Sequence, residues 1–380
     1  MRIAVIGGGP AGLLFAKLAK QADSTHEIDV YEQNPAHATY GFGVVLADVA
    51  LNILDDVDSD LRRRISQNAE FQTHITLTHK GEGIPLLGNA FMGVSRVKLL
   101  QVMQENARKE GVQIIFEKRI ATPDLRSDYD LVVGADGVNS AVRTSLNQFF
   151  QATKEPRLNK WIWYGTTKRL DSVNLVFQPS PHGTFIAHSY RYAPDYGTCV
   201  IECSEASWRA ARLDKANDEE SRAICETVFK DFLGGESLIS NRSLWFTPEF
   251  VTSKHWHHEN VVLIGDALKT VHPSIGSGTR VALQDAIALA KALRANSRDV
   301  QATFAQFERE RRGGAGSFQD AAMKSILWYE SVDERMHLEP VAFAYDYMMR
   351  TGRVDHERLR RQDPAFAARV ESLSQDKLRA

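Results

Sequence analysis

The chain has 380 residues, a formal net charge of −2, and a composition that is 43% hydrophobic and 25% charged. A chain of this length can bury a large core in two or three domains, and the composition is that of an ordinary globular protein. The charge gives no overall attraction to nucleic acid or to an anionic membrane, and no apolar stretch reaches the length of a membrane span. We therefore expect neither nucleic acid nor a membrane as a partner.

The first twelve residues carry the most informative motif of the chain. Residues 2–6 are apolar and rich in β-branched side chains, which predicts a buried strand, and Gly7, Gly9 and Gly12 then give the pattern G-x-G-x-x-G. These glycines allow a tight turn, close approach of the backbone to a pyrophosphate, and close packing of a helix on the strand. The motif predicts a βαβ unit that binds an adenine dinucleotide.

An acidic residue stands where such a unit needs one. The next predicted strand covers residues 27–32 and ends at Glu32, about twenty residues beyond the last glycine, where a carboxylate can bind a ribose hydroxyl. The alternative is a carboxylate at a solvated strand end.

The middle of the chain predicts further strands and helices. In chain order, we expect a charged helix over residues 47–66, alternating strands over 71–93, a helix over 95–111 and a strand over 112–116. Residues 160–204 are rich in aromatic and β-branched side chains, which is typical of an antiparallel sheet, and residues 205–233 are expected to be helical. A strand over 260–264, a helix over 280–294 and a charged helical tail follow, with a kink or break expected at residues 313–316.

A second motif lies at residues 130–143. An apolar strand ends in Gly-Ala-Asp136-Gly and turns into a helix. A carboxylate at the carboxyl end of a strand can orient ribose hydroxyls or a loop that covers them. The alternative is a turn in which Asp136 hydrogen-bonds the following backbone, which Asp-Gly readily forms.

A third motif begins with the predicted strand at 260–264. That strand delivers Asp266, and a glycine-rich loop containing Gly276 and Gly278 then opens a helix near Thr279. The backbone N–H groups at such a helix N-terminus stabilise negative charge.

The three motifs, in this order, resemble those of the class A flavoprotein aromatic hydroxylases, the group typified by 4-hydroxybenzoate hydroxylase. The match over residues 130–143 is nearly complete. By this resemblance, FAD is held by Gly7, Gly9, Gly12, Glu32 and Gln33 at its ADP half, by Arg96, by Asp136, by Asp266 at its ribityl–pyrophosphate region, and by Gly276, Gly278 and Thr279 at its pyrimidine edge. The chain departs from the family at Gln33 (often Arg), Lys269 (usually His) and Arg280 (usually Asn).

The resemblance implies a discontinuous α/β fold. A Rossmann-like FAD domain is interrupted by an antiparallel-sheet substrate domain and is followed by a helical C-terminal tail. The expected FAD domain comprises residues 1–70, 94–155 and 255–320, the substrate domain 71–93 and 156–254, and the tail 321–380.

A finer resemblance points to one branch of the family. The matching segments are residues 160–168, 185–192, 200–204, 276–279, 334–338 and 359–364. This branch contains salicylyl-CoA 5-hydroxylases, the monooxygenase half of 2-aminobenzoyl-CoA monooxygenase/reductase, and the tryptophan-ring hydroxylase of violacein biosynthesis. It implies a small aromatic substrate, with an aryl-CoA thioester favoured and a free indole or tryptophan-derived compound as the alternative.

The chemistry implied by the resemblance is an oxygen transfer. NAD(P)H reduces FAD, O₂ adds at C4a, and the resulting flavin hydroperoxide hydroxylates an electron-rich ring in a site that excludes water. The candidates for holding or polarising the substrate are His188, Tyr190 and Trp163, while Pro273 is expected to shape the backbone beside the flavin. The alternatives are core or sheet-face aromatics and a simple turn proline.

Other interpretations of the sequence have less support. A flavin halogenase would need W-x-W-x-I-P, but Tyr164 and Gly165 follow the two tryptophans, and a non-catalytic flavoprotein is the remaining class. A basic patch for CoA phosphates is conceivable at Arg350, Arg353, Arg358, Arg360 and Arg361, although interleaved acids favour a solvated charged helix. We expect no metal: His255, His257 and His258 lie in a predicted solvated loop.

Cysteine usage bears on the compartment. Cys199, Cys203 and Cys225 form no C-x-x-C and are expected to be buried thiols rather than metal ligands or disulfides. The predicted first strand leaves no room for a signal peptide, so a reducing cytoplasm is the simplest location. A monomer or a homodimer is expected.

Overall fold

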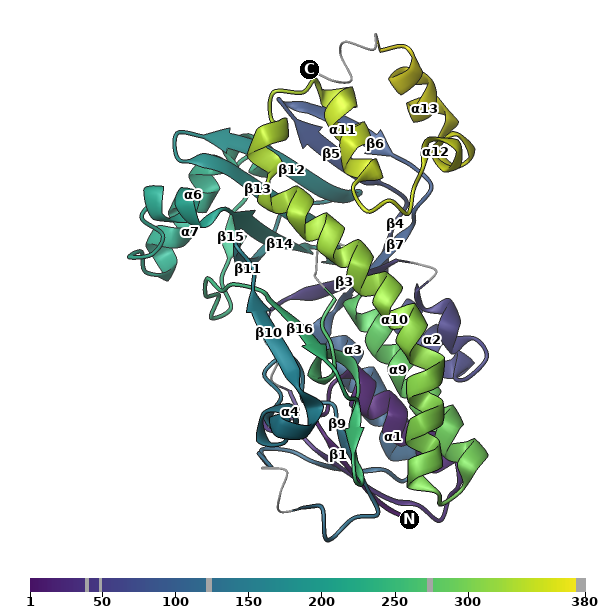
Figure 1. Cartoon of the computed structure of the whole chain (residues 1–380). Coiled ribbons are helices and arrows are strands. Elements are labelled where there is room, and N and C mark those ends of the chain that lie inside the picture. Colours follow the sequence, from purple (N-terminus) through teal and green to yellow (C-terminus); the bar gives the residue numbers. More distant parts are fainter. Residues whose placement is uncertain (38–40, 48–49, 121–124, 272–275, 374–380) are drawn as a thin grey trace.

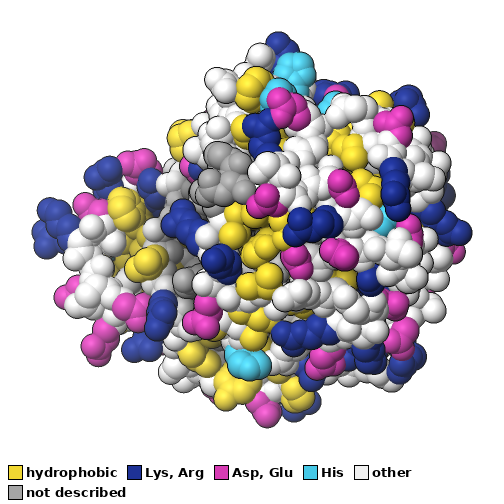
Figure 2. All heavy atoms as spheres, turned by 90° about the horizontal axis from the view of Figure 1, so that it is seen from below, with side chains coloured by type: hydrophobic (Ala, Val, Ile, Leu, Met, Phe, Trp, Pro, Cys, Tyr) yellow, Lys and Arg dark blue, Asp and Glu magenta, His cyan; other side chains and the backbone are white. Residues whose placement is uncertain are grey.

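The computed structural model describes residues 1–37, 41–47, 50–120, 125–271 and 276–373 (Figure 1). The described chain forms a lower part around a parallel sheet and an upper part around a larger, mainly antiparallel sheet, with a long helix running between them. No helix among the described residues is long and apolar enough to cross a membrane. Cationic and acidic side chains are interspersed over the face seen in Figure 2, as the small net charge leads one to expect.

The lower part is built on a six-stranded sheet. Its strands, in spatial order, are β17 (His257–His258), β18 (Val261–Leu263), β9 (Leu131–Gly134), β1 (Arg2–Ile6), β2 (Glu27–Tyr31) and β8 (Gln113–Ile115). All pairs are parallel except β17 with β18. β9 is buried along its whole length, as parallel strands covered on both faces are.

Strand order places the nucleotide motifs together. The chain leaves β1 for β2 on one side and returns to β9 on the other, so the carboxyl ends of β1 and β9 flank the topological switch point. The sheet packs against α1 (Pro10–Ala22), α3 (Arg96–Lys109) and α9 (Gly278–Asn296). The described strands follow the fold class expected from the sequence.

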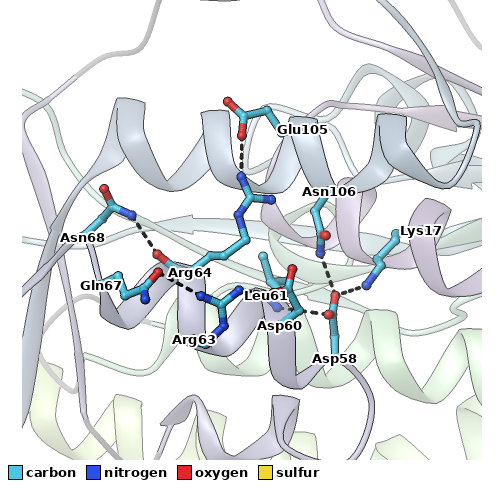
Figure 3. A network of polar contacts seen from close by, with 10 residues as sticks. All are labelled: Lys17, Asp58, Asp60, Leu61, Arg63, Arg64, Gln67, Asn68, Glu105 and Asn106. Carbon is cyan, nitrogen blue, oxygen red and sulfur yellow. Dashed lines mark hydrogen bonds and ion pairs between the residues drawn. The ribbon is translucent and has the colours of Figure 1, made fainter.

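A buried polar network joins three helices of the lower part (Figure 3). Asp58, the N-cap of α2 (Ser59–Ser66), accepts a hydrogen bond from the Leu61 amide at 3.0 Å and pairs with Lys17 of α1. Asn106 of α3 donates its side-chain amide to the same carboxylate at 2.8 Å. Because these partners satisfy the buried carboxylate, the network fixes α2 against α1 and α3.

The prediction of a single helix over residues 47–66 is wrong in its first half. The segment 43–47 forms β3 (Gly43–Ala47), and the described residues 50–57 hold 3₁₀ and turn structure, including η2 (Asn52–Leu54), but no α-helix. Asp58 caps α2 and thereby sets the point at which the helix begins.

Two smaller sheets lie between the lower and upper parts. β3 pairs with β7 (Phe91–Ser95), which also pairs with β4 (Ala69–Gln72). β10 (Ala152–Pro156) pairs with β16 (Glu249–Ser253). The short helices α4 (Ala141–Ser145) and α5 (Asn147–Phe150) precede β10.

The upper part is built on a seven-stranded sheet. In spatial order its strands are β15 (Leu238–Ile239), β11 (Lys160–Thr166), β14 (Tyr196–Cys203), β13 (Gly183–Ala193), β12 (Val173–Ser180), β5 (Ile75–His79) and β6 (Glu82–Leu86). One face packs against α6 (Glu205–Ala210), α7 (Asp218–Val228) and α8 (Lys230–Leu233). The other face packs against the C-terminal helices, so the two faces bury separate apolar cores.

The longest helix, α10 (Val300–Glu330), lies beside α9 and reaches the upper sheet (Figure 1). It continues without interruption through residues 313–316, so the break expected there is wrong. η6 (Val332–Arg335), α11 (Pro340–Met349), α12 (His356–Gln362) and α13 (Pro364–Glu371) follow it. α10 also crosses residue 321, and the limits given above for the three regions stay predictions.

Candidate FAD and substrate site

The glycine loop after β1 has room only for glycine at two positions. Gly7 has φ +112°, and a Cβ there would lie 2.3 Å from the Ala135 carbonyl oxygen. A Cβ on Gly12 would lie 2.2 Å from the Gly7 carbonyl oxygen. Around Gly9, in contrast, no described atom lies within 4 Å of an added Cβ. The loop therefore packs tightly on the β9 side and leaves an open face at Gly9, as a cradle for a pyrophosphate requires.

The helix that begins at this loop is suited to an anion. α1 starts at Pro10, its N-cap Gly9 makes no side-chain cap hydrogen bond, and its first turn holds no acid. The helix N-terminus therefore carries uncompensated partial positive charge next to the open face.

Glu32 contacts the glycine loop directly. The Gly8 amide donates to Glu32 Oε2 at 2.9 Å, and Oε1 accepts from the Asn34 backbone and side-chain amides at 2.8 and 2.7 Å. The carboxylate is thus fixed beside the loop rather than left as a solvated strand end. The neighbouring Gln33 is exposed.

Asp136 forms the turn that the sequence left as an alternative. Its carboxylate accepts hydrogen bonds from the Ser140 hydroxyl and from the amides of Ala141 and Val142 at 2.7 and 3.2 Å, at the start of α4. Burial raises the pKa of Asp136, and these hydrogen bonds oppose that rise. A role for Asp136 toward ribose or a covering loop stays a prediction.

Arg143 connects the second motif to the third, and the sequence reasoning gave it no role. Its guanidinium is buried and donates to the carbonyl oxygens of Val138, at 2.5 Å, and Ala267, at 2.9 Å. The available signal was that Arg143 is the one cationic residue in the sequence of this motif. Its hydrogen bonds hold the Asp136 turn against the Asp266 turn.

Asp266 and Arg96 carry opposite charges that interact across the expected flavin site. Both side chains are exposed to solvent, yet the surrounding protein desolvates each of them. Desolvation raises the pKa of Asp266 to about 6, although Arg96 and Lys269 oppose the rise, and it lowers the pKa of Arg96. Charged groups in this state are suited to a polar ligand that takes the place of water.

A buried ion cluster contacts the backbone of the turn that carries Asp266. Lys269 Nζ lies 2.6 Å from Asp285 Oδ2, which also accepts the Gly265 amide at 3.2 Å, and Arg311 Nε lies 2.9 Å from Oδ1. Desolvation lowers the pKa of Lys269, and Asp285 opposes that shift. The departure at Lys269 is therefore accommodated by a counter-ion on α9.

The third motif opens α9 as expected. Gly276 has φ +59°, and the helix begins at Gly278 and Thr279 with no side-chain cap and no acid in its first turn. Pro273 lies outside the described residues.

One face of the upper sheet presents the predicted substrate residues. His188 on β13 lies 3.0 Å from the buried Glu202 on β14, measured between Nε2 and Oε2. Glu202 Oε1 accepts the Asn159 side-chain amide at 2.7 Å. The ring of His188 stacks on Trp161 at 5.1 Å and lies 5.3 Å from the ring of Tyr329. His188 is thus oriented in an aromatic wall by a carboxylate that the sequence reasoning did not single out.

The two other aromatic candidates have different surroundings. The hydroxyl of Tyr190 is buried and donates to the Gly43 carbonyl oxygen at 2.9 Å, which ties β13 to β3. Trp163 is half-buried beside Gly41, and its Nε1 has no hydrogen-bond partner among the described residues. Tyr190 thus matches the core alternative, whereas Trp163 offers a donor to a ligand.

The three histidines before β18 differ: His255 is exposed and outside any strand, as expected of a solvated loop, whereas the other two are not. His257 and His258 form β17 and are half-buried; His257 pairs with Glu308 at 3.4 Å, and His258 stacks on Phe149 at 3.5 Å. The three cysteines are buried and free. Burial raises the pKa of Cys199 to about 11, so this thiol is not a reactive group.

Comparison with known proteins agrees with this geometry. Residues 1–321 match the family described as FAD binding domain. Salicyloyl-CoA 5-hydroxylase of a Streptomyces species is 35% identical over 98% of this chain and 73% of its own length. Protodeoxyviolaceinate monooxygenase of Chromobacterium violaceum is 36% identical over 91% of this chain and 94% of its own. The solved structure of a mutant of 2-methyl-3-hydroxypyridine-5-carboxylic acid oxygenase matches with a TM-score of 0.74 at 18% identity, covering 93% of this chain and 98% of its own.

The chain belongs to this FAD binding domain family. Within it, the protein is a flavin-dependent aromatic monooxygenase, in the branch that includes the salicyloyl-CoA and violacein-pathway enzymes.

Proposed function

We propose that the protein uses FAD and NAD(P)H to hydroxylate the ring of an aromatic acid carried as a thioester. The observation that carries the proposal is the convergence of three distant motifs at the carboxyl ends of β1, β9 and β18, where Arg143 joins the second motif to the third. The thioester is supported by two relatives: the salicyloyl-CoA enzyme, and a 3-hydroxy-4-methyl-anthranilyl-[aryl-carrier protein] 5-monooxygenase of Streptosporangium sibiricum, 34% identical over 87% of this chain and 89% of its own.

The residues present fit an FAD molecule. The open face at Gly9 and the uncapped α1 N-terminus would take the pyrophosphate, and Glu32, Arg96 and Asp266 are placed to bind its polar parts. The N-terminus of α9 would stabilise negative charge on the reduced ring system. When bound, FAD supplies the redox chemistry, for which NAD(P)H and O₂ are the expected co-substrates.

His188 is the residue best suited to the substrate's exchangeable proton. An aromatic ring becomes more reactive toward an electrophilic oxygen when its hydroxyl or amino group is polarised, and imidazole can do this near neutral pH. The Glu202 carboxylate accepts a hydrogen bond from Nε2–H of His188, which leaves Nδ1 as the ring atom available to a substrate. Trp161 and Tyr329 cover the imidazole and limit its contact with water.

A free indole or tryptophan-derived substrate is the second candidate, supported by the violacein-pathway relative. The decisive test is turnover by purified, FAD-loaded protein offered salicylyl-CoA, 2-aminobenzoyl-CoA and indole substrates, with NADH and NADPH compared for each. We expect substrate-stimulated nicotinamide oxidation and a ring-hydroxylated thioester. A chloride-dependent product would indicate a halogenase instead, and a colourless protein that does not bind FAD would contradict the proposal.

A further inference from the structure

Two arginines from distant segments pack on the same phenylalanine. Arg280, in the first turn of α9, lies 5.7 Å from the centre of the Phe318 ring, measured from the guanidinium carbon. Arg353, between α11 and α12, lies 4.2 Å from the centre of the same ring. We call Arg280, Arg353 and Phe318 the arginine clamp.

The clamp gathers positive charge that no described carboxylate neutralises through an ion pair. Among the described residues, the groups that act on the Arg353 charge are other arginines, and Arg280 Nε is buried with no hydrogen-bond partner. Besides the ring, the Arg353 guanidinium makes long hydrogen bonds to Ser317, at 3.2 and 3.3 Å. Its pKa is lowered by desolvation and further by Arg280 and Arg358.

The position of Arg280 on its helix makes the electrostatic energy of the clamp more unfavourable. Arg280 stands at the N-terminal end of α9, where the partial positive charge of the helix repels a cation, and the first turn contains no acid. Arg358 contributes a third guanidinium and donates to the Arg353 carbonyl oxygen at 3.0 Å. Unneutralised guanidinium groups held this close favour a bound anion, above all one that accepts several hydrogen bonds.

The neighbouring arginines behave differently. Arg360 lies 2.6 Å from Glu371, and Arg361 lies 3.8 Å from Glu357. Arg350 packs on Tyr347 at 3.8 Å and donates to its carbonyl oxygen at 2.9 Å. The basic patch conceivable from the sequence therefore divides into arginines paired with acids, a packed arginine and the clamp.

The clamp adjoins the segment expected beside the flavin. Phe318 packs with Val271, Val281 and Ala322, which belong to the end of the third motif, to α9 and to α10. Phe318 of the clamp and Tyr329 of the aromatic wall both lie on α10, about 16 Å apart along the helix axis, so a ligand that joins the wall to the clamp must span roughly this distance.

We propose that Arg280 and Arg353 bind a phosphate of the phosphopantetheine tail that carries the aryl thioester. The inference rests on the proposed function, since a free aromatic acid has no such tail. CoA and a carrier protein's prosthetic group share this chemistry.

The test is equilibrium binding to the FAD-loaded protein. The probes are CoA, 4′-phosphopantetheine and pantetheine, and the variants are Arg353→Gln and Arg280→Gln, with Arg361→Gln as the matched control. We expect the two clamp variants to bind both phosphorylated probes about tenfold or more weakly and pantetheine unchanged, because a charge-assisted phosphate contact is lost. Arg361→Gln should bind all three probes as the wild type does. Arg353→Gln is the primary variant because it lies outside the FAD motifs, and equal FAD content shows that folding is intact.

Unchanged binding of CoA and 4′-phosphopantetheine by the clamp variants would overturn the inference, and so would an equal loss for pantetheine. If only CoA responds, the clamp binds the nucleotide phosphates, and the assignment to the phosphate of the tail is overturned. If 4′-phosphopantetheine responds equally, the clamp binds the phosphate that CoA and a carrier protein's prosthetic group share, which supports the inference. If the clamp variants bind the probes as the wild type does and the protein still hydroxylates an aromatic ring, the inference fails and the proposed function stands. If CoA binding depends on the arginines but no ring is hydroxylated, the proposed function alone is contradicted.

Discussion

His188 on β13 and Glu202 on β14 form a buried pair, with 3.0 Å between Nε2 and Oε2. The register of the two strands produces this contact. His188 lies opposite Val200, and Glu202, two residues further along β14, projects from the same face of the sheet as His188. We predict that Glu202→Leu lowers kcat about tenfold or more, because the imidazole loses its orienting partner. Glu202→Gln should retain more activity, since an amide oxygen can still accept the Nε2 proton. Steady-state kinetics at equal FAD content check this, and identical kcat values in the two variants would contradict it.

A substitution at Gly9 should weaken FAD binding with little effect on folding. Gly9→Ala meets no described atom within 4 Å, so the free energy of unfolding should change by less than about 1 kcal/mol. The added methyl group would occupy the face where the pyrophosphate approaches, so FAD affinity should fall about tenfold or more. Gly313→Ala, which also meets no described atom within 4 Å, is the control and should leave FAD affinity unchanged. FAD titration and urea unfolding measure both effects.

Arg143 should matter for both stability and cofactor affinity. Arg143→Gln removes the buried guanidinium that spans Val138 and Ala267, and we expect a loss of about 2–4 kcal/mol in the free energy of unfolding. FAD binding should weaken as well, because the second and third motifs lose their connection. Urea unfolding of the FAD-free protein and FAD titration test the two effects separately. A loss of stability with unaltered FAD affinity would show that the two turns keep their positions without Arg143.

Asp266 should make the stability of the FAD-free protein depend on pH. Its pKa is raised to about 6 from the ordinary value of 3.8, so the folded state retains a proton that the unfolded chain has released. This contribution to stability is therefore lost as the pH rises through that interval. Asp266→Asn removes the titration, so its stability relative to the wild type should increase between about pH 4 and pH 6 and level off above. Unfolding free energies across this range check the sign.

The glycine motif and the acids after the strands could be predicted because each is local. Gly7 has a positive φ, and Gly12 packs closely against the backbone. Both constraints can be recognised from a short stretch of sequence. Glu202 could not be found in this way, because its partner is set by the register of β13 and β14. The same holds for Arg143, whose acceptors lie both beside it and more than a hundred residues away.

Predictions from local sequence were wrong where tertiary packing determines the secondary structure. Glycines at 313 and 316 suggested a kink or break, but the helix α10 continues through them, because its two ends are buried in separate apolar cores, one in the lower part and one against the upper sheet. Charged residues over 47–66 suggested one helix, but Asp58 is committed to a cap and to Lys17. For Tyr190 the sequence left a substrate contact and a core role open, and its hydroxyl joins two strands, which agrees with the core alternative.

The length of α10 has a mechanical consequence. Arg311 near its middle meets the ion cluster under Asp266, and Tyr329 near its end meets the ring of His188. These two positions are about 27 Å apart along a continuous helix that rises about 1.5 Å per residue. A tilt of α10 would therefore displace the ion cluster beside the proposed FAD site and the ring beside the proposed substrate site in a single movement.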